Sequence, residues 1–151
     1  MKMSEYSIEV FKDPKMLRSK LDLYLQSSPE KVEIYANACE RFFYLGGKRI
    51  LKFDPTWSWW GFFCRFFLCR KNYIEALVIF ICSIFLSWIP LLIWVVCGVF
   101  AKYSVCMNFL KCLEMQDDEM LSIQGGTNDW VIYIAIIFIV AAFLIGIFAA
   151  L

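Results

Sequence analysis

The sequence contains no histidine, so it lacks the side chain that most often serves as a general base or a zinc ligand. Its seven cysteines stand at positions 39, 64, 69, 82, 97, 106 and 112, and no two of them have the spacing of a zinc or dithiol redox motif. Neither glycine pair, 46–47 or 125–126, belongs to a phosphate-binding loop. These absences predict a protein that is not an enzyme and that has no cofactor and no metal.

Signals for processing and for a disulfide framework are also missing. The first ten residues show no apolar segment with a cleavage site, so no signal peptide is predicted and the N-terminus is expected in the cytoplasm. Most cysteines are interpreted as small buried hydrophobic residues in a reducing or lipid environment. The acidic cluster of Glu114, Asp117, Asp118 and Glu119 lacks the spacing of a calcium-binding loop and is interpreted as a solvated charge run.

Charge is scarce in the second half of the chain. Of the 15 lysine and arginine residues, only Lys102 and Lys111 follow Ile74. The composition is 61% hydrophobic and 19% aromatic, with a mean hydropathy of +0.62, which exceeds what a soluble domain of this size carries. The basic residues of the first half are interleaved with acidic ones, which argues against nucleic-acid binding. The pattern predicts a polar N-terminal head and a membrane tail.

The N-terminal head, residues 1–52, is predicted to be a cytoplasmic αα-hairpin. Asp13 and Pro14 supply an N-cap and a first-turn proline, and Ser28 and Pro29 do the same for a second helix that stops at 46–47. One face of each helix is apolar: Leu17, Leu21, Tyr24 and Leu25, then Val32, Tyr35, Cys39, Phe42 and Phe43. These faces either pack against each other or form a partner-binding groove.

Between Trp57 and Tyr73, eight aromatic and three basic residues occupy seventeen positions. A helix over 57–68 would be only about 18 Å long, too short to span a bilayer. We therefore predict a short amphipathic helix at the membrane interface, within residues 53–73. The predicted interface residues of the whole chain are Trp57, Trp59, Trp60, Arg65, Arg70, Lys71, Tyr73, Trp88 and Trp130.

Residues 76–101 carry no charge and are interrupted by Pro90. They fit either one kinked helix of about 39 Å or a transmembrane hairpin over 74–107 that turns near Trp88 and has two spans of about 17 residues. A polar acidic loop is predicted at 108–129 and a C-terminal transmembrane helix at 130–151. In that helix Ala142, Gly146 and Ala150 form a small-residue stripe suited to helix packing.

Six residues in the aromatic segment match a known hallmark: Trp57, Phe62, Phe66 in place of a second tryptophan, Arg70, Lys71 and Tyr73. Further on, Gly98, Phe100 and Ala101 match a Gly-x-Phe-Ala-Asn stretch, with Lys102 in place of the asparagine. Over about residues 53–113 the chain thus resembles the bacterial family called domain of unknown function 2628. It departs at Phe63-Cys64, where the family has Gly-Pro, and at Cys69, where tyrosine is usual. The resemblance implies a hydrophobic hairpin in a bacterial membrane and implies no activity.

Together these patterns predict an all-α membrane protein with a cytoplasmic αα-hairpin, an interfacial aromatic helix and about three transmembrane helices. We expect a multi-pass protein of the bacterial inner membrane, with its N-terminus in the cytoplasm. The expected function is that of a non-enzymatic accessory or scaffold protein that contacts the lipid bilayer and a membrane protein partner or a second copy of itself. The alternatives are a lipid-interacting membrane-surface protein and a subunit of an oligomeric channel or transporter.

Overall fold

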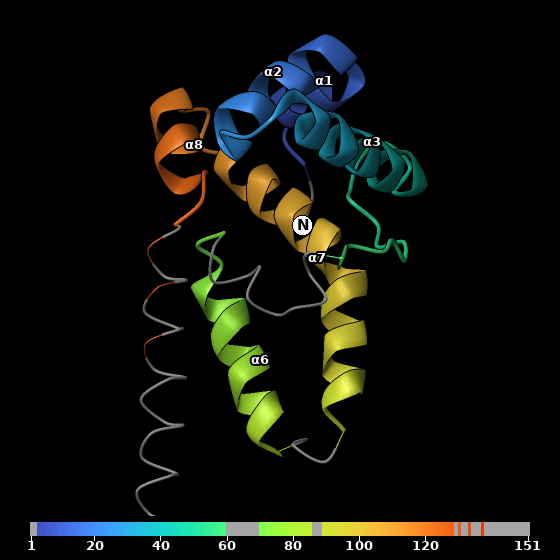
Figure 1. Ribbon diagram of the computed structural model, residues 1–151. Coiled ribbons are helices and arrows are strands. Elements are labelled where there is room, and N and C mark those ends of the chain that lie inside the picture. Colours follow the sequence, from blue (N-terminus) through green and yellow to red (C-terminus); the bar gives the residue numbers. More distant parts are fainter. Residues whose placement is uncertain are drawn as a thin grey trace, which may run out of the picture.

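The computed structural model describes residues 3–59, 70–85 and 89–128, together with Trp130, Tyr133 and Ile137. The described residues form helices and no strand, in agreement with the all-α prediction (Figure 1). The helices are α1 (Glu5–Lys12), α2 (Pro14–Leu25), α3 (Pro29–Leu45), α6 (Tyr73–Phe85), α7 (Pro90–Leu113) and α8 (Asp118–Gln124). The C-terminal segment with the Ala142, Gly146 and Ala150 stripe lies outside the described residues, as do Trp60, Arg65 and Trp88.

Local signals determine where α2 and α3 begin and end. The Asp13 carboxylate accepts hydrogen bonds from the Lys15 and Met16 amides, and Pro14 opens α2 as predicted. Helix α3 begins at Pro29 and ends before Gly46, and Gly47 takes a φ of +67° that favours glycine. The sequence-based interpretation missed α1, which begins after Ser4, whose hydroxyl accepts from the Ser7 amide.

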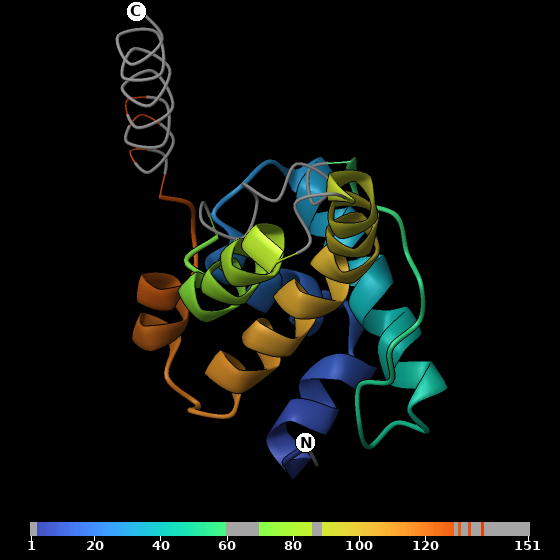
Figure 2. The same cartoon turned by 90° about the horizontal axis from the view of Figure 1, so that it is seen from below.

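Helix α7 belongs to two parts of the molecule. Its C-terminal half passes beneath α1, α2 and α3 and fills the space between them (Figures 1 and 2). Its buried side chains recur at helical spacing: Val105, Cys106, Phe109, Leu110 and Leu113. Phe109 lies between Phe11 and Tyr24, with ring centroids 6.0 and 5.5 Å away. We call α1, α2, α3, α8 and residues 102–113 of α7 the helical body.

The structure changes the interpretation of residues 108–129, which were expected to form a polar loop. This segment contains the last residues of α7 and the whole of α8. Asp117 caps α8 by accepting from the Glu119 and Met120 amides, and Leu121 is buried in the same core as α2. The acidic residues therefore help to build the helical body, because Asp118 also pairs with Lys20 and Glu114 accepts from the Ser4 amide.

The N-terminal half of α7 pairs with α6 outside the helical body. The two helices run antiparallel, so this part of the chain is a helical hairpin and not one kinked helix (Figure 1). The break precedes Pro90, which occupies the first turn of α7, where its missing amide proton costs nothing. A small second core joins them: Ala76, Ile93, Cys97 and Ala101. We call α6 and residues 90–101 of α7 the apolar hairpin.

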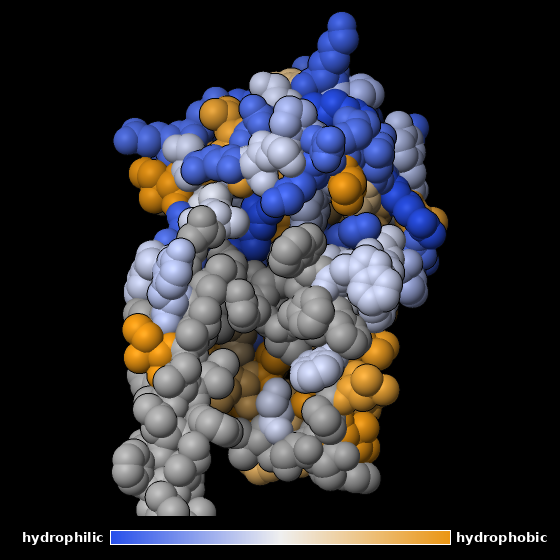
Figure 3. Space-filling model, in the orientation of Figure 1, coloured by the Kyte–Doolittle hydropathy of each residue, from blue (hydrophilic) through white to orange (hydrophobic). Residues whose placement is uncertain are grey.

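Of the helices in the described ranges, one stretch, Leu91–Leu113, is long and apolar enough to cross a membrane, and Tyr73–Ser83 is a shorter apolar helix. Most of the apolar surface is on the hairpin, where Figure 3 shows orange side chains below the largely blue helical body. The second half of Leu91–Leu113 is largely buried in the helical body, whereas the large side chains of its first half are mostly exposed.

Residues 53–58 have no regular secondary structure, so the predicted interfacial helix does not begin at Trp57. Asp54, in this segment, pairs with Arg41 of α3. The strand-like path of this segment is fixed against α7, because the Ser58 amide donates to the Gly98 carbonyl at 2.9 Å. A Cβ at Gly98 would lie 3.2 Å from the Trp57 ring, so glycine allows this close approach.

Candidate functional site

Polar side chains collect where the apolar hairpin joins the helical body. Asn72, just before α6, donates to Ser104 at 3.1 Å and accepts from Asn108 at 2.8 Å. Glu75 accepts from the Ser104 hydroxyl and from Asn72, and Lys111 donates to Asn108 at 3.2 Å. We call these five residues the junction network. Asn72 and Ser104 are buried, so their mutual hydrogen bonds offset the cost of removing them from water.

The junction network forms one wall of an open pocket of about 490 Å³. Helices α2, α6, α7 and α8 all contribute to it, through Tyr24, Glu75, Cys112 and Gln124 among others. Two ammonium groups belong to its lining: Lys111 and Lys71. The pocket therefore combines two positive charges with one carboxylate and an apolar edge at Ile74, an arrangement suited to a polar or anionic group attached to an apolar chain.

Burial affects two of the titratable groups that line the pocket. Burial raises the pKa of the Tyr24 hydroxyl and the pKa of the Cys112 thiol above their ordinary values. Both groups are therefore neutral near pH 7, and a neutral thiol is a poor nucleophile. Cys112 instead donates to Gln124 across α7 and α8 at 3.1 Å. The arrangement supports binding and positioning.

Arg70 and Lys71, predicted as membrane-interface residues, donate hydrogen bonds to carbonyls near the ends of α2 and α8. Arg70 is 8% exposed, and its guanidinium donates to the Leu25 carbonyl at the end of α2 and lies 5.6 Å from the Tyr35 ring centroid. The Lys71 ammonium donates to the Ile123 carbonyl in α8 at 2.8 Å. Cations are favourable at helix C-termini because the last carbonyls have no partner within the helix. Arg70 is therefore buried against groups of the protein itself, and its role at a membrane interface stays a prediction.

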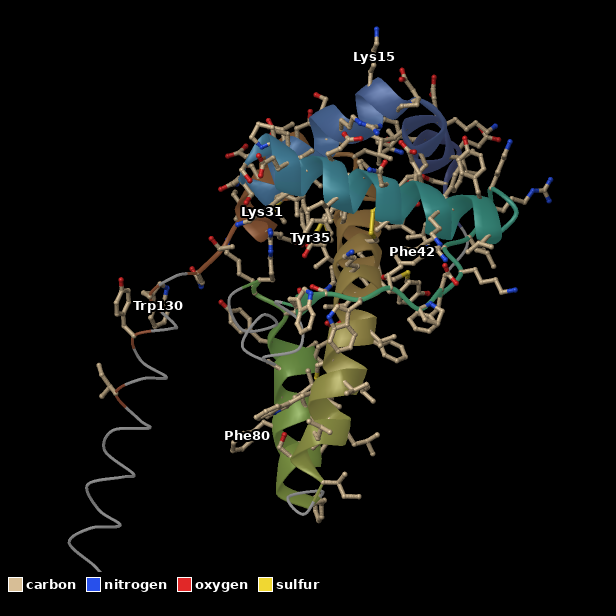
Figure 4. The ribbon with its side chains drawn as sticks, turned by 45° about the vertical axis from the view of Figure 1, so that its right-hand side comes forward. Lys15, Lys31, Tyr35, Phe42, Phe80 and Trp130 are labelled. Carbon is tan, nitrogen blue, oxygen red and sulfur yellow. A yellow bond between two sulfur atoms is a disulfide. The ribbon has the colours of Figure 1, made fainter. Side chains whose placement is uncertain are left out.

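Burial also raises the pKa of Tyr35, the aromatic residue that lies beside Arg70. The loss of water around Tyr35 raises the pKa of its hydroxyl to about 12, although the nearby Arg70 charge acts in the opposite direction. Tyr35 and Phe42 both point from α3 toward α7 (Figure 4). The guanidinium is therefore enclosed by a neutral aromatic ring and a backbone carbonyl within the helical body.

The other predicted interface residues are placed as follows. Trp59 is 71% exposed and packs edge-on against Trp57, which is partly exposed. The Tyr73 hydroxyl accepts from Asn128 at 2.7 Å, and Trp130 follows that asparagine with an exposed side chain (Figure 4). These four aromatic residues lie at or near the ends of the apolar hairpin, a location consistent with an interface.

Helices α3 and α7 are joined by a disulfide between Cys39 and Cys106, with Cα atoms 5.7 Å apart (Figure 4). The expectation that most cysteines are simple buried hydrophobic residues is therefore wrong for this pair. The two residues are 67 positions apart, so no local spacing signals that they meet. Cys82 and Cys112 are free thiols in the described part of the chain.

The junction network was also missed from the sequence, apart from Glu75. One signal was available: Ser104, Asn108 and Lys111 recur at i, i+4 and i+7, which places three polar groups on one face of an otherwise apolar helix. In the structure the Glu75 carboxylate is bound by Asn72 and Ser104. No protein-family model, curated protein or solved structure matches the chain.

Proposed function

We propose that the protein is a small, non-enzymatic integral membrane protein that acts as an accessory or scaffold protein and presents its helical body at the membrane surface. One observation carries this proposal: α7 is a single helix whose first half is apolar and exposed and whose second half is the centre of the helical body. A membrane-embedded hairpin would thereby hold the body in a fixed orientation, since no flexible linker separates the two.

The apolar hairpin supports membrane insertion because its large side chains face outward. Ile74, Leu77, Phe80, Phe85 and Leu91 are all more than half exposed, and Phe80 points away from α7 (Figure 4). Fully removing one such side chain from water contributes about 1.5–3 kcal/mol. Exposed apolar surface of this extent marks a membrane or protein contact site.

Contact with a protein partner is proposed for the end of α3. The apolar faces of α2 and α3 are covered by α7 and α8, so a groove between them is not open to a partner. Tyr44, Leu45 and Ile50 are exposed beside one another, because Ile50 packs against the turn at Gly46. These three residues offer exposed apolar side chains at the end of α3 and in the turn that follows it.

A photo-crosslinking amino acid incorporated in place of Leu45 is expected to form a discrete covalent adduct with a partner protein in native membranes. The matched control is the same amino acid at Lys15, an exposed position whose side chain projects from the top of the body, away from α7 (Figure 4). The membranes are first extracted with alkaline carbonate, which should leave the protein in the pellet. The accessory role is contradicted if positions 44, 45 and 50 yield no protein adduct while the protein behaves as a monodisperse monomer.

A second candidate function is recognition of a lipid at the membrane surface, and the pocket favours it. Its two lysines and apolar edge suit an anionic phospholipid headgroup. We expect Lys111→Gln to lower the amount of anionic phospholipid that remains bound after detergent purification, measured by mass spectrometry of extracted lipid. Lys31→Gln, a change at an exposed lysine of α3, serves as the control. Equal lipid content in both variants and the parent would argue against this function.

The side of the membrane on which the body lies is part of the proposal. The sequence predicts a cytoplasmic N-terminus in a bacterial inner membrane, with a multi-pass topology. The Cys39–Cys106 disulfide favours the opposite side, because disulfides persist in oxidising compartments and are rare in the cytosol. We therefore propose membrane association with the body on the oxidising side.

A further inference from the structure

The apolar hairpin has a defined reach beyond the helical body. The charge-free part of α6 runs from Ala76 to Phe85 and that of α7 from Pro90 to Ala101. At 1.5 Å per residue these ten and twelve residues measure about 15 and 18 Å. The two helices have similar lengths, so both extend about equally far from the base of the hairpin to the break near Ile89 (Figure 1).

The base of the hairpin is fixed and cannot move deeper. Ala101 and Val105 mark the point where α7 enters the core, since both are almost fully buried. Glu75 and Asn72 are bound to Ser104 at the same level. A deeper insertion would carry this polar network and the charged body into hydrocarbon, where polar groups without hydrogen-bond partners are strongly unfavourable.

The hydrocarbon core of a bilayer is about 30 Å thick, so one leaflet accounts for about 15 Å. We propose that the apolar hairpin enters one leaflet only, with the break near Ile89 close to the bilayer midplane, and that it does not cross the membrane. This proposal rests on the proposed membrane association. It differs from the sequence-based prediction of two full spans because the residues after Ala101, which would complete the second span, are the core of the helical body.

Acyl chains, and not a second protein, are the occupant that fits this surface. The contact between the helices is made by Ala76, Ile93, Cys97 and Ala101, and most of the other large side chains described on the hairpin are exposed. Exposed side chains occur at successive positions of α6, as at Leu77 and Val78, and Phe80 and Ile81, so they form a broad outer face on the sides of the helix away from α7. A protein partner would cover one face, whereas lipid covers all of them. The ordinary helical hydrogen bonds satisfy the backbone there.

The test measures the depth of single spin labels in the reconstituted full-length protein. The parent retains the Cys39–Cys106 disulfide and has its five other cysteines replaced by alanine. Labels are introduced by Lys102→Cys at the base, Val95→Cys in the middle and Ile89→Cys at the break. Phe85→Cys is a second position near the break; its side chain is 78% exposed, so little packing is lost. The depth of each label is calculated from the ratio of its accessibility to oxygen to its accessibility to a water-soluble nickel chelate.

The proposal expects depth to increase continuously from position 102 to 95 to 89, with position 89 about 9 Å deeper than position 95. A maximum at 95, with positions 85 and 89 again shallow and accessible to the chelate, would show a complete crossing and overturn the proposal while leaving membrane association intact. Chelate accessibility at all four positions would show that the hairpin is outside the bilayer, in which case the proposed membrane function itself fails.

Discussion

Phe109→Ala is expected to destabilise the helical body by about 3–5 kcal/mol, the usual cost of removing a large aromatic side chain from a packed core. Phe109 is fully buried and lies against Phe11 and Tyr24, so its loss removes contacts that join α1, α2 and α7. Because domains of this size are stable by only about 5–15 kcal/mol, a large part of the stability would be lost. Urea titration in detergent, followed by near-ultraviolet circular dichroism, measures the change.

The same experiment separates two roles for the second half of α7. If residues 102–113 were surrounded by lipid, removing Phe109 would leave the unfolding of the body almost unchanged. Phe80→Ala is the matched control, because that ring is exposed on the apolar hairpin, and we expect a change within about 0.5 kcal/mol. Equal effects of the two substitutions would contradict the placement of α7 at the centre of the helical body.

Loss of the Cys39–Cys106 disulfide is expected to lower the free energy of unfolding by about 4 kcal/mol, the loop-closure value for a separation of this size. The bond closes a segment with a sequence separation of 67 that includes the whole apolar hairpin. The double change Cys39→Ala and Cys106→Ala should therefore reduce the urea midpoint strongly. The same titration of the parent with reductant should give a similar decrease.

Two controls accompany the disulfide experiment. Reductant should not change the double variant further, and Cys112→Ala, at a buried free thiol, should not abolish the response of the parent to reductant. Alkylation of free thiols in intact cells before lysis then shows whether the Cys39–Cys106 disulfide is formed in the compartment where the protein lies. Free Cys39 and Cys106 under those conditions would place the body in a reducing compartment and contradict the proposed oxidising side.

Local chemistry made the helices of the N-terminal head predictable. Asp13-Pro14 and Ser28-Pro29 start helices because the proline ring suits the first turn and the preceding residue can occupy the N-cap. The apolar spacing of Leu17, Leu21 and Tyr24 identified a buried face. Alternative packing partners remained open, since periodicity shows which face is buried and does not show against what.

The site at the base of the hairpin was not predictable in the same way. Asn72 and Asn108 are 36 residues apart, and Arg70 reaches a carbonyl 45 residues away. In the sequence Arg70 and Lys71 stand beside aromatic residues, a pattern typical of a membrane interface. Only the folded chain shows that the ends of α2 and α8 lie next to them and offer unpaired carbonyls.

The sequence by itself determined the helical class, the caps of α2 and α3 and the contrast between a charged first half and an apolar second half, because these depend on neighbouring residues and on composition. The tertiary structure decided the role of α7, the disulfide and the reach of the hairpin. A continuous apolar helix has the same composition whether lipid or protein surrounds it. What distinguishes its two halves is the presence of α1, α2 and α3 around one of them, and that depends on contacts between residues far apart in the chain.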